Sequence, residues 1–170
     1  RRARLSRALV YVYFKDKADL HFALVERSLD ALRQHFEAAR AGRESGLAEV
    51  EAIGRAYLAF ERETPHYFDA CARFQAHTSA ERDVPPNEAA CMCSGHRVHE
   101  VMVESLNRGI GDGSIRANIG DPYTTALALW AFSFGVIQIA ASKAGQMEHE
   151  GVAVQQFVEH AFAMALRSLQ

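Results

Sequence analysis

Residues 5–20 have the sequence Leu5-Ser6-Arg7-Ala8-Leu9-Val10-Tyr11-Val12-Tyr13-Phe14-Lys15-Asp16-Lys17-Ala18-Asp19-Leu20 and predict two helices joined by a tight turn. Ser6 can cap the first helix, because its side-chain oxygen can accept a hydrogen bond from a backbone N–H one turn further on. Asp16 can cap the second helix in the same way. Arg7, Tyr11 and Lys15 fall near one face of the first helix at helical spacing.

The first of these helices carries residue types that contact DNA. An Arg near the start of a helix can pair with guanine in the major groove, and Tyr hydroxyls can hold phosphates. The first seventeen residues hold six cations against one acid, Asp16; the cations are Arg1, Arg2, Arg4, Arg7, Lys15 and Lys17. This local excess is typical of a nucleic-acid-binding face. The alternative is a surface helix whose aromatic side chains dock on its own core.

This segment resembles the end of the helix-turn-helix in the tetracycline-repressor (TetR) family of transcriptional regulators. The resembling residues are Ser6-Arg7-Ala8, Tyr11-Val12-Tyr13-Phe14 and Lys15-Asp16-Lys17-Ala18-Asp19-Leu20. The resemblance implies that Arg7 reads a base with Ser6 and Ala8 close by, and that Tyr11, Tyr13 and Lys17 hold phosphates.

The resemblance also implies a division of the chain into two parts. The family's head has two helices before the recognition helix, and the sequence from Arg1 lacks them. We therefore expect residues 1–20 to form the C-terminal part of a DNA-binding head. Residues 21–170 are expected to form a helical ligand-binding and dimerisation domain.

Composition limits the class of protein. The chain has 170 residues, 49% hydrophobic and 24% charged, with a net charge of −2, which is typical of a soluble globular protein. Three cysteines, an odd number, argue against a disulfide framework and favour the cytoplasm. We expect no signal peptide and no membrane span, because the longest apolar stretch, Ala126 to Ala141, contains polar residues and is short.

The apolar residues recur with the period of a helix and hardly anywhere with that of a strand. The fold class predicted is all-α. Besides the opening helix, we expect helices at about residues 17–41, 47–63, 66–77, 87–108, 121–142 and 152–169, with a loop at 78–86. In the helix from Lys17, the expected core residues are Leu20, Leu24, Leu32 and Phe36. Glycines in the stretch 109–113 are expected to stop the helix before it.

The last two long helices are predicted to pair with those of a second copy. The helix from Asp121 is apolar nearly all round, and the helix to Leu169 has a wide apolar stripe, so together they exceed what one chain can cover. The resemblance implies the same four-helix pairing. We expect a homodimer, in which a charge at Ala161 or Phe162 disrupts the seam.

A group of aromatic residues with scattered polar side chains has two interpretations. One is plain core packing. The other is an apolar pocket between helices in which a few polar groups orient a small apolar ligand. The predicted lining residues are Phe60, Phe74, His77, His99, Trp130, Phe134 and Gln138.

The stretch from Cys91 to Glu100 has metal-ligand residue types, and Cys93, His96 and Glu100 could share one helix face. Its spacing matches no zinc signature, so we predict no metal and no cofactor. Neither Ser133-Phe134-Gly135 nor Gly111-Asp112-Gly113 has the residues of a nucleophile elbow or a phosphate loop. We therefore predict that the protein is not an enzyme.

These observations favour a ligand-responsive DNA-binding transcriptional regulator. The expected form is a repressor that a small apolar ligand releases from double-stranded operator DNA. The alternative is a helical small-molecule or protein-binding module without a DNA-binding role. Phosphate contacts distinguish the two, because they make DNA affinity fall steeply with salt. The sequence leaves the identity of the ligand open.

Overall fold

The computed structural model describes residues 7–74 and 86–170, and the side chains from residue 9 onward within them. This part of the chain contains helices and no strand, which confirms the all-α fold class. The helices are α1 (Arg7–Tyr13), α2 (Lys17–Arg40), α3 (Gly46–Glu63), α4 (Pro65–Ala72), α5 (Pro86–Asp112), α6 (Pro122–Ser142), α7 (Ala144–His149) and α8 (Val154–Arg167).

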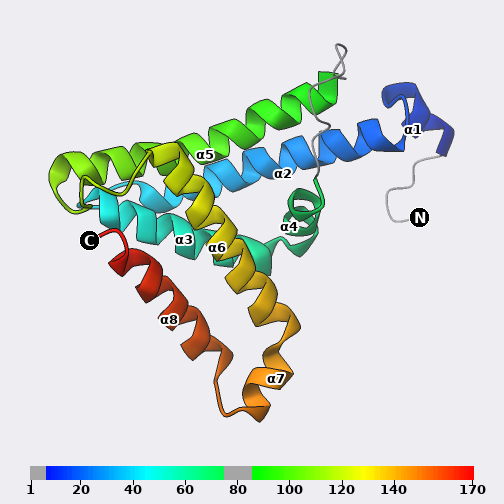
Figure 1. Cartoon of the computed structure of the whole chain (residues 1–170). Coiled ribbons are helices and arrows are strands. Elements are labelled where there is room, and N and C mark those ends of the chain that lie inside the picture. Colours follow the sequence, from blue (N-terminus) through cyan, green and yellow to red (C-terminus); the bar gives the residue numbers. More distant parts are fainter. Residues whose placement is uncertain (1–6, 75–85) are drawn as a thin grey trace.

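Three long helices, α2, α3 and α5, pack along one another and form the body of the molecule (Figure 1). Helix α6 crosses this body and contacts α5 and α3, while α8 packs beside α6. The short helix α1 lies at the beginning of α2, at one end of the body (Figure 1). The chain thus places α1 at the far end of a helix that belongs to the core.

The predicted helix starts agree with the structure. The Asp16 side chain accepts a hydrogen bond from the backbone N–H of Asp19 at 2.9 Å. The Asp121 side chain accepts from the N–H of Thr124 at 2.7 Å. Pro122 occupies the first turn of α6, where its missing N–H has no helical partner to lose.

Three helices differ from the prediction. Helix α4 ends at Ala72 and not at about residue 77. Helix α5 continues through Gly109 to Asp112 and ends before Gly113, which has a positive φ of 77°. The reason is packing, because a Cβ atom on Gly46 would lie 2.1 Å from the backbone nitrogen of Gly109. Gly46 thus allows α3 and α5 to approach closely, and a Cβ atom on Gly109 itself would lie 2.5 Å from the Ile115 side chain. The third difference is α7, a short helix that was not predicted.

Polar contacts join the beginning of α3 to the end of α5. The backbone N–H of Gly46 donates to Asp112 Oδ2 at 2.8 Å, and the N–H of Leu47 donates to Ser114 Oγ at 3.1 Å. Arg108 forms an ion pair with Glu49. We call this end, from Gly46 and Glu49 to Arg108, Asp112 and Ser114, the α3–α5 junction.

The apolar side of α2 is shifted at its first turns. Leu32 is buried as expected, but Leu20 and Leu24 are exposed. Phe22 and Val25 are buried in their place, with Cys91 of α5 beside them. The cause is the position of α4 and α5, which contact α2 on the side that carries Phe22 and Val25.

The structure also corrects the expected seam on α8. Ala161 and Phe162 are buried within the chain, in a cluster with Val136 of α6. A Cβ atom on Gly54 of α3 would lie 2.5 Å from the Phe162 ring. These two residues therefore hold α8 onto its own chain, so a charge at either position would test folding and not dimerisation.

The outward faces of α6 and α8 carry exposed apolar residues. On α6 these are Leu127, Phe132 and Ile139, and on α8 Met164 is half exposed. We call these four residues the α6–α8 face. An 18-residue window of α6 has a mean hydropathy of 1.6 with 17% of it buried, so by length and composition this helix could cross a membrane.

Candidate functional site

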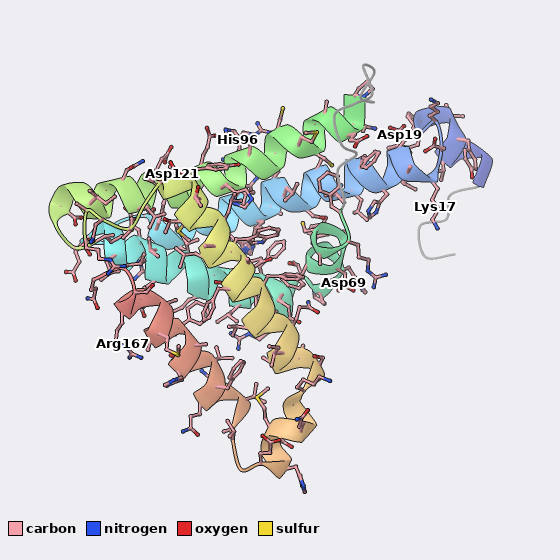
Figure 2. All side chains as sticks on the ribbon, viewed as in Figure 1. Lys17, Asp19, Asp69, His96, Asp121 and Arg167 are labelled. Atoms are coloured by element: carbon pink, nitrogen blue, oxygen red, sulfur yellow. The ribbon has the colours of Figure 1, made fainter. Side chains whose placement is uncertain are left out.

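The short helix α1 presents its aromatic residues to solvent. Tyr11 is 54% exposed and Tyr13 is 75% exposed. Lys17 is exposed at the first position of α2 (Figure 2). Arg7 and Ala8 belong to the same helix, but the structure describes only their backbone. Ser6 lies outside the described residues.

The turn between α1 and α2 is fixed by carboxylates. Asp19 Oδ2 accepts a hydrogen bond from the backbone N–H of Lys15 at 3.0 Å. Asp19 Oδ1 accepts a second hydrogen bond, from Asn87 Nδ2 of α5, at 2.7 Å. The orientation of α1 thus depends on a side chain that α5 supplies.

A cavity of about 610 Å³ lies within the helical body. Its walls come from α2, α3, α4, α5 and α6, with Phe36, Ile53, Ala72, Val98 and Leu129 among the apolar lining residues. This volume is within the range of sites that bind small molecules, and such sites are lined mostly by apolar and aromatic side chains.

Four of the predicted pocket residues line this cavity: Phe74, His99, Trp130 and Phe134. Phe60 is fully buried in the core beside the cavity, where its ring contacts His35 edge-on at 5.4 Å. Gln138 is exposed on α6, one turn after Phe134, and is not a lining residue. His77 lies outside the described residues.

The polar groups of the cavity belong to α3, α5 and α6. Trp130 Nε1 donates to the Tyr57 hydroxyl oxygen at 3.3 Å. Burial raises the pKa of Tyr57 to about 12, so this hydroxyl keeps its proton at neutral pH. The His99 ring meets Trp130 edge-on at 5.5 Å. Burial, and secondly the nearby His96, lower the pKa of His99, which favours its neutral form.

Two cysteines line the cavity as protonated thiols. Burial raises the pKa of Cys71 to about 12 and that of Cys91 to about 11. The Cys91 thiol donates to the backbone oxygen of Phe22 on α2 at 2.8 Å. These thiols are poor nucleophiles, since the thiolate is the reactive form.

The metal interpretation of α5 gains no support. His96 Nε2 lies 3.2 Å from Glu100 Oε1, and Cys93 is exposed. Within residues 7–74 and 86–170, no group of three or more His, Cys, Asp or Glu side chains could hold a metal ion.

The cavity reaches the beginning of α2 through two contacts. Besides the thiol bond from Cys91, the ring of Phe74 meets that of Phe22 edge-on at 6.1 Å. Phe22 lies three residues after Asp19, which holds the α1–α2 turn. A molecule that displaced Phe74 or Cys91 would therefore act on the part of α2 nearest to α1.

Several lining residues were not predicted as such. On α5, Met92, Gly95, His99 and Met102 follow one another at spacings of three and four, which is a stripe along one helix face. This spacing is visible in the sequence. Of this stripe only His99 was predicted to line the pocket, because the neighbouring stretch has the residue types of a metal site. Tyr57 is both buried and at the cavity wall.

Comparison with known proteins identifies the family. Residues 50–165 match the family model described as "Tetracyclin repressor-like, C-terminal domain". This range includes most of the cavity wall and the whole of α6. No curated protein matches the chain.

Two solved structures are similar in fold. A protein with unknown function from Rhodococcus sp. RHA1 is 23% identical, with a TM-score of 0.72 over 99% of this chain and 80% of that chain. The crystal structure of the "putative regulatory protein SCO4313" is 17% identical, with a TM-score of 0.65 over 98% of this chain and 81% of that chain. Since the family model spans more than half of the sequence, the chain belongs to the tetracyclin repressor-like (TetR) family.

Proposed function

We propose that this TetR-family protein is a ligand-responsive DNA-binding transcriptional regulator. It acts in the cytoplasm as a homodimeric repressor, and a small apolar ligand releases it from operator DNA. One observation carries the proposal: α2 lines the cavity through Leu29, Leu32 and Phe36, and the same helix carries α1 at its beginning. The regulatory protein of similar fold supports a role of this kind.

The proposed DNA contacts lie on α1 and at the start of α2. Arg7 reads a base, with Ser6 and Ala8 close by, while Tyr11, Tyr13 and Lys17 bind phosphates. The exposure of Tyr11, Tyr13 and Lys17 supports this assignment. In a dimer the two α1 helices enter successive major grooves, about 34 Å apart.

The proposed dimer forms through the α6–α8 face. Four large apolar side chains are exposed there, and a second copy of the chain could bury them. Four-helix pairing of α6 and α8 with a second copy would cover them.

The proposed response to ligand follows the contacts at the start of α2. Filling the cavity moves Phe74 and Cys91, which contact Phe22, and this shifts the turn that orients α1. A ligand can release DNA only if it binds the DNA-incompetent arrangement more tightly.

The test measures operator binding by the naturally encoded full-length protein. Fluorescence anisotropy gives the affinity at each concentration of a salt series. We expect affinity to fall steeply between about 50 mM and 200 mM salt, since phosphate contacts release counterions. Nile red, an uncharged apolar dye, should lower operator affinity and raise the melting temperature. A protein that binds the dye but no DNA would favour the alternative, a helical binding module without a DNA role.

A further inference from the structure

The described wall of the cavity contains no Asp, Glu, Lys or Arg side chain. A charged molecule that enters such a site loses its hydration, and only an opposite charge or several hydrogen bonds can offset that loss. The wall therefore disfavours carboxylates and ammonium groups alike.

The two histidines at the wall do not supply a free positive charge. Burial lowers the pKa of His99, so its ring is neutral at neutral pH. His96 Nε2 lies 3.2 Å from Glu100 Oε1, so a carboxylate already stands beside this ring. An anionic ligand would thus find no unpaired cation among the described lining residues.

Aromatic rings and sulfur atoms dominate the wall instead. Trp130 meets His99 edge-on at 5.5 Å and Phe134 in a tilted contact at 6.3 Å. Sulfur atoms line the cavity from α4 and α5, at Cys71, Cys91, Met92 and Met102. Both groups favour an aromatic guest, because rings prefer tilted or edge-on ring contacts and sulfur packs well against ring edges.

The Tyr57 hydroxyl is a hydrogen-bond donor at this wall. The Tyr57 oxygen accepts from Trp130 Nε1 at 3.3 Å, so its own hydrogen is left for another partner. No described residue accepts that hydrogen. A buried hydroxyl without an acceptor costs free energy, which a ligand with an acceptor atom would recover.

From these observations we propose that the cavity binds an uncharged aromatic molecule whose acceptor atom, such as a carbonyl oxygen, takes a hydrogen bond from Tyr57. This inference rests on the proposed function, since it names the chemical class of the effector.

The test compares four naphthalene derivatives of similar shape on the full chain by titration calorimetry. Acetylnaphthalene is neutral and has a carbonyl acceptor, whereas isopropenylnaphthalene is neutral without one. Naphthoate is an anion and naphthylmethylammonium is a cation. We expect acetylnaphthalene to bind at least about tenfold more tightly than either ion, and about fivefold more tightly than isopropenylnaphthalene.

A pair of variants locates the donor. Tyr57→Phe keeps the ring and removes the hydroxyl, so it should abolish the preference for acetylnaphthalene over isopropenylnaphthalene. Tyr67→Phe on α4 makes the same change outside the cavity wall and should leave that preference intact. The melting temperature of each unliganded variant shows whether its fold is intact.

The outcomes separate the ligand class from the ligand site. Tightest binding by naphthoate or naphthylmethylammonium would overturn the ligand class and leave a ligand-binding cavity in place. A preference that survives in Tyr57→Phe would overturn the role of Tyr57. If none of the four compounds binds, this inference is wrong, and the ligand response proposed above is wrong as well only if Nile red also fails to bind.

Discussion

Asn87 Nδ2 lies 2.7 Å from Asp19 Oδ1, and this hydrogen bond joins the first turn of α5 to the first turn of α2. The same carboxylate accepts the backbone N–H of Lys15, between α1 and α2. The contact thus connects the helix that forms much of the cavity wall with the turn that orients α1.

The first prediction concerns this contact. Asn87→Leu removes the donor, so Nile red should release operator DNA less effectively, while dye binding in the cavity stays within about twofold of wild type. The free energy of unfolding should fall by about 0.5–1.5 kcal/mol, as for a lost hydrogen bond. Anisotropy with and without dye measures the effect. Asn107→Leu, at an exposed position on the same helix, is the control and should change neither quantity. Equal dye response in both variants would contradict the proposed connection.

The second prediction separates base contacts from phosphate contacts in the full-length protein. Arg7→Ala should cost about 1–3 kcal/mol of operator affinity and relax specificity at one base pair. Lys17→Gln should weaken binding to all sequences alike and reduce the salt slope by about 1. Lys143→Gln, an exposed lysine after α6, should leave binding unchanged. Unchanged operator affinity in Arg7→Ala would show that Arg7 does not contact DNA.

The third prediction concerns the α6–α8 face. Leu127→Glu places a charge on an exposed position, so it should give a folded monomer in sedimentation at micromolar concentration. Phe162→Glu places the same charge in the buried cluster of α8, so it should unfold the chain or make it insoluble. A wild-type chain that sediments as a stable monomer would count against the dimer.

The fourth prediction concerns the α3–α5 junction. Gly46→Ala should lower the free energy of unfolding by about 1–3 kcal/mol or more, because the new methyl group meets the backbone of Gly109. Gly111→Ala is the matched control on α5, where a Cβ meets nothing within 4 Å. That change should be neutral or should stabilise the helix by up to about 1 kcal/mol. Urea unfolding compares the two, and equal stabilities would show that the helices can separate at this point.

The fifth prediction concerns pH. The pKa of His99 is lowered in the folded chain, so the unfolded chain binds more protons below its ordinary value of 6.5. The neutral His99 ring therefore contributes fully to the free energy of unfolding above pH 6.5. This contribution is lost as pH falls from 6.5 towards the lower pKa that His99 has in the folded chain. The titratable groups facing His99 are His96, paired with Glu100 on α5, and Tyr123 on α6. His99→Gln should show a smaller loss between pH 7 and pH 5 in thermal unfolding, and an unchanged loss would assign it to other groups.

Local signals in the sequence predicted the helices and their starts well. Asp16 and Asp121 are capping residues whose effect depends on backbone three residues away, so neighbouring residues determine it. Gly109 was misinterpreted because a glycine suits a turn and a close helix contact equally well. The contact with Gly46 arises only when two segments distant in sequence meet.

The cavity could be predicted only in part, for the same reason. His99, Trp130 and Phe134 lie on faces that helical spacing reveals, whereas the separation of lining from core residues depends on where other helices diverge. Phe60 and Tyr57 are both buried aromatic residues on α3, yet only Tyr57 lines the cavity. Gln138 lies one turn after Phe134 on α6, yet it is exposed and does not line the cavity, and the pattern within one helix did not show where the cavity wall ends.

The close approach of Gly46 and Gly109 anchors one end of the helical body, so a rotation about that end moves the opposite end most. At that end Arg40 of α2 also pairs with Glu104 of α5 at 2.7 Å, so the end of α2 is anchored beside the glycines. Helix α2 has 24 residues and is therefore about 36 Å long. A rotation of about 5° around the anchored end would move its first residue by roughly 3 Å over this length. In a dimer, opposite rotations would change the spacing of the two α1 helices by roughly twice that amount, against a groove repeat of about 34 Å.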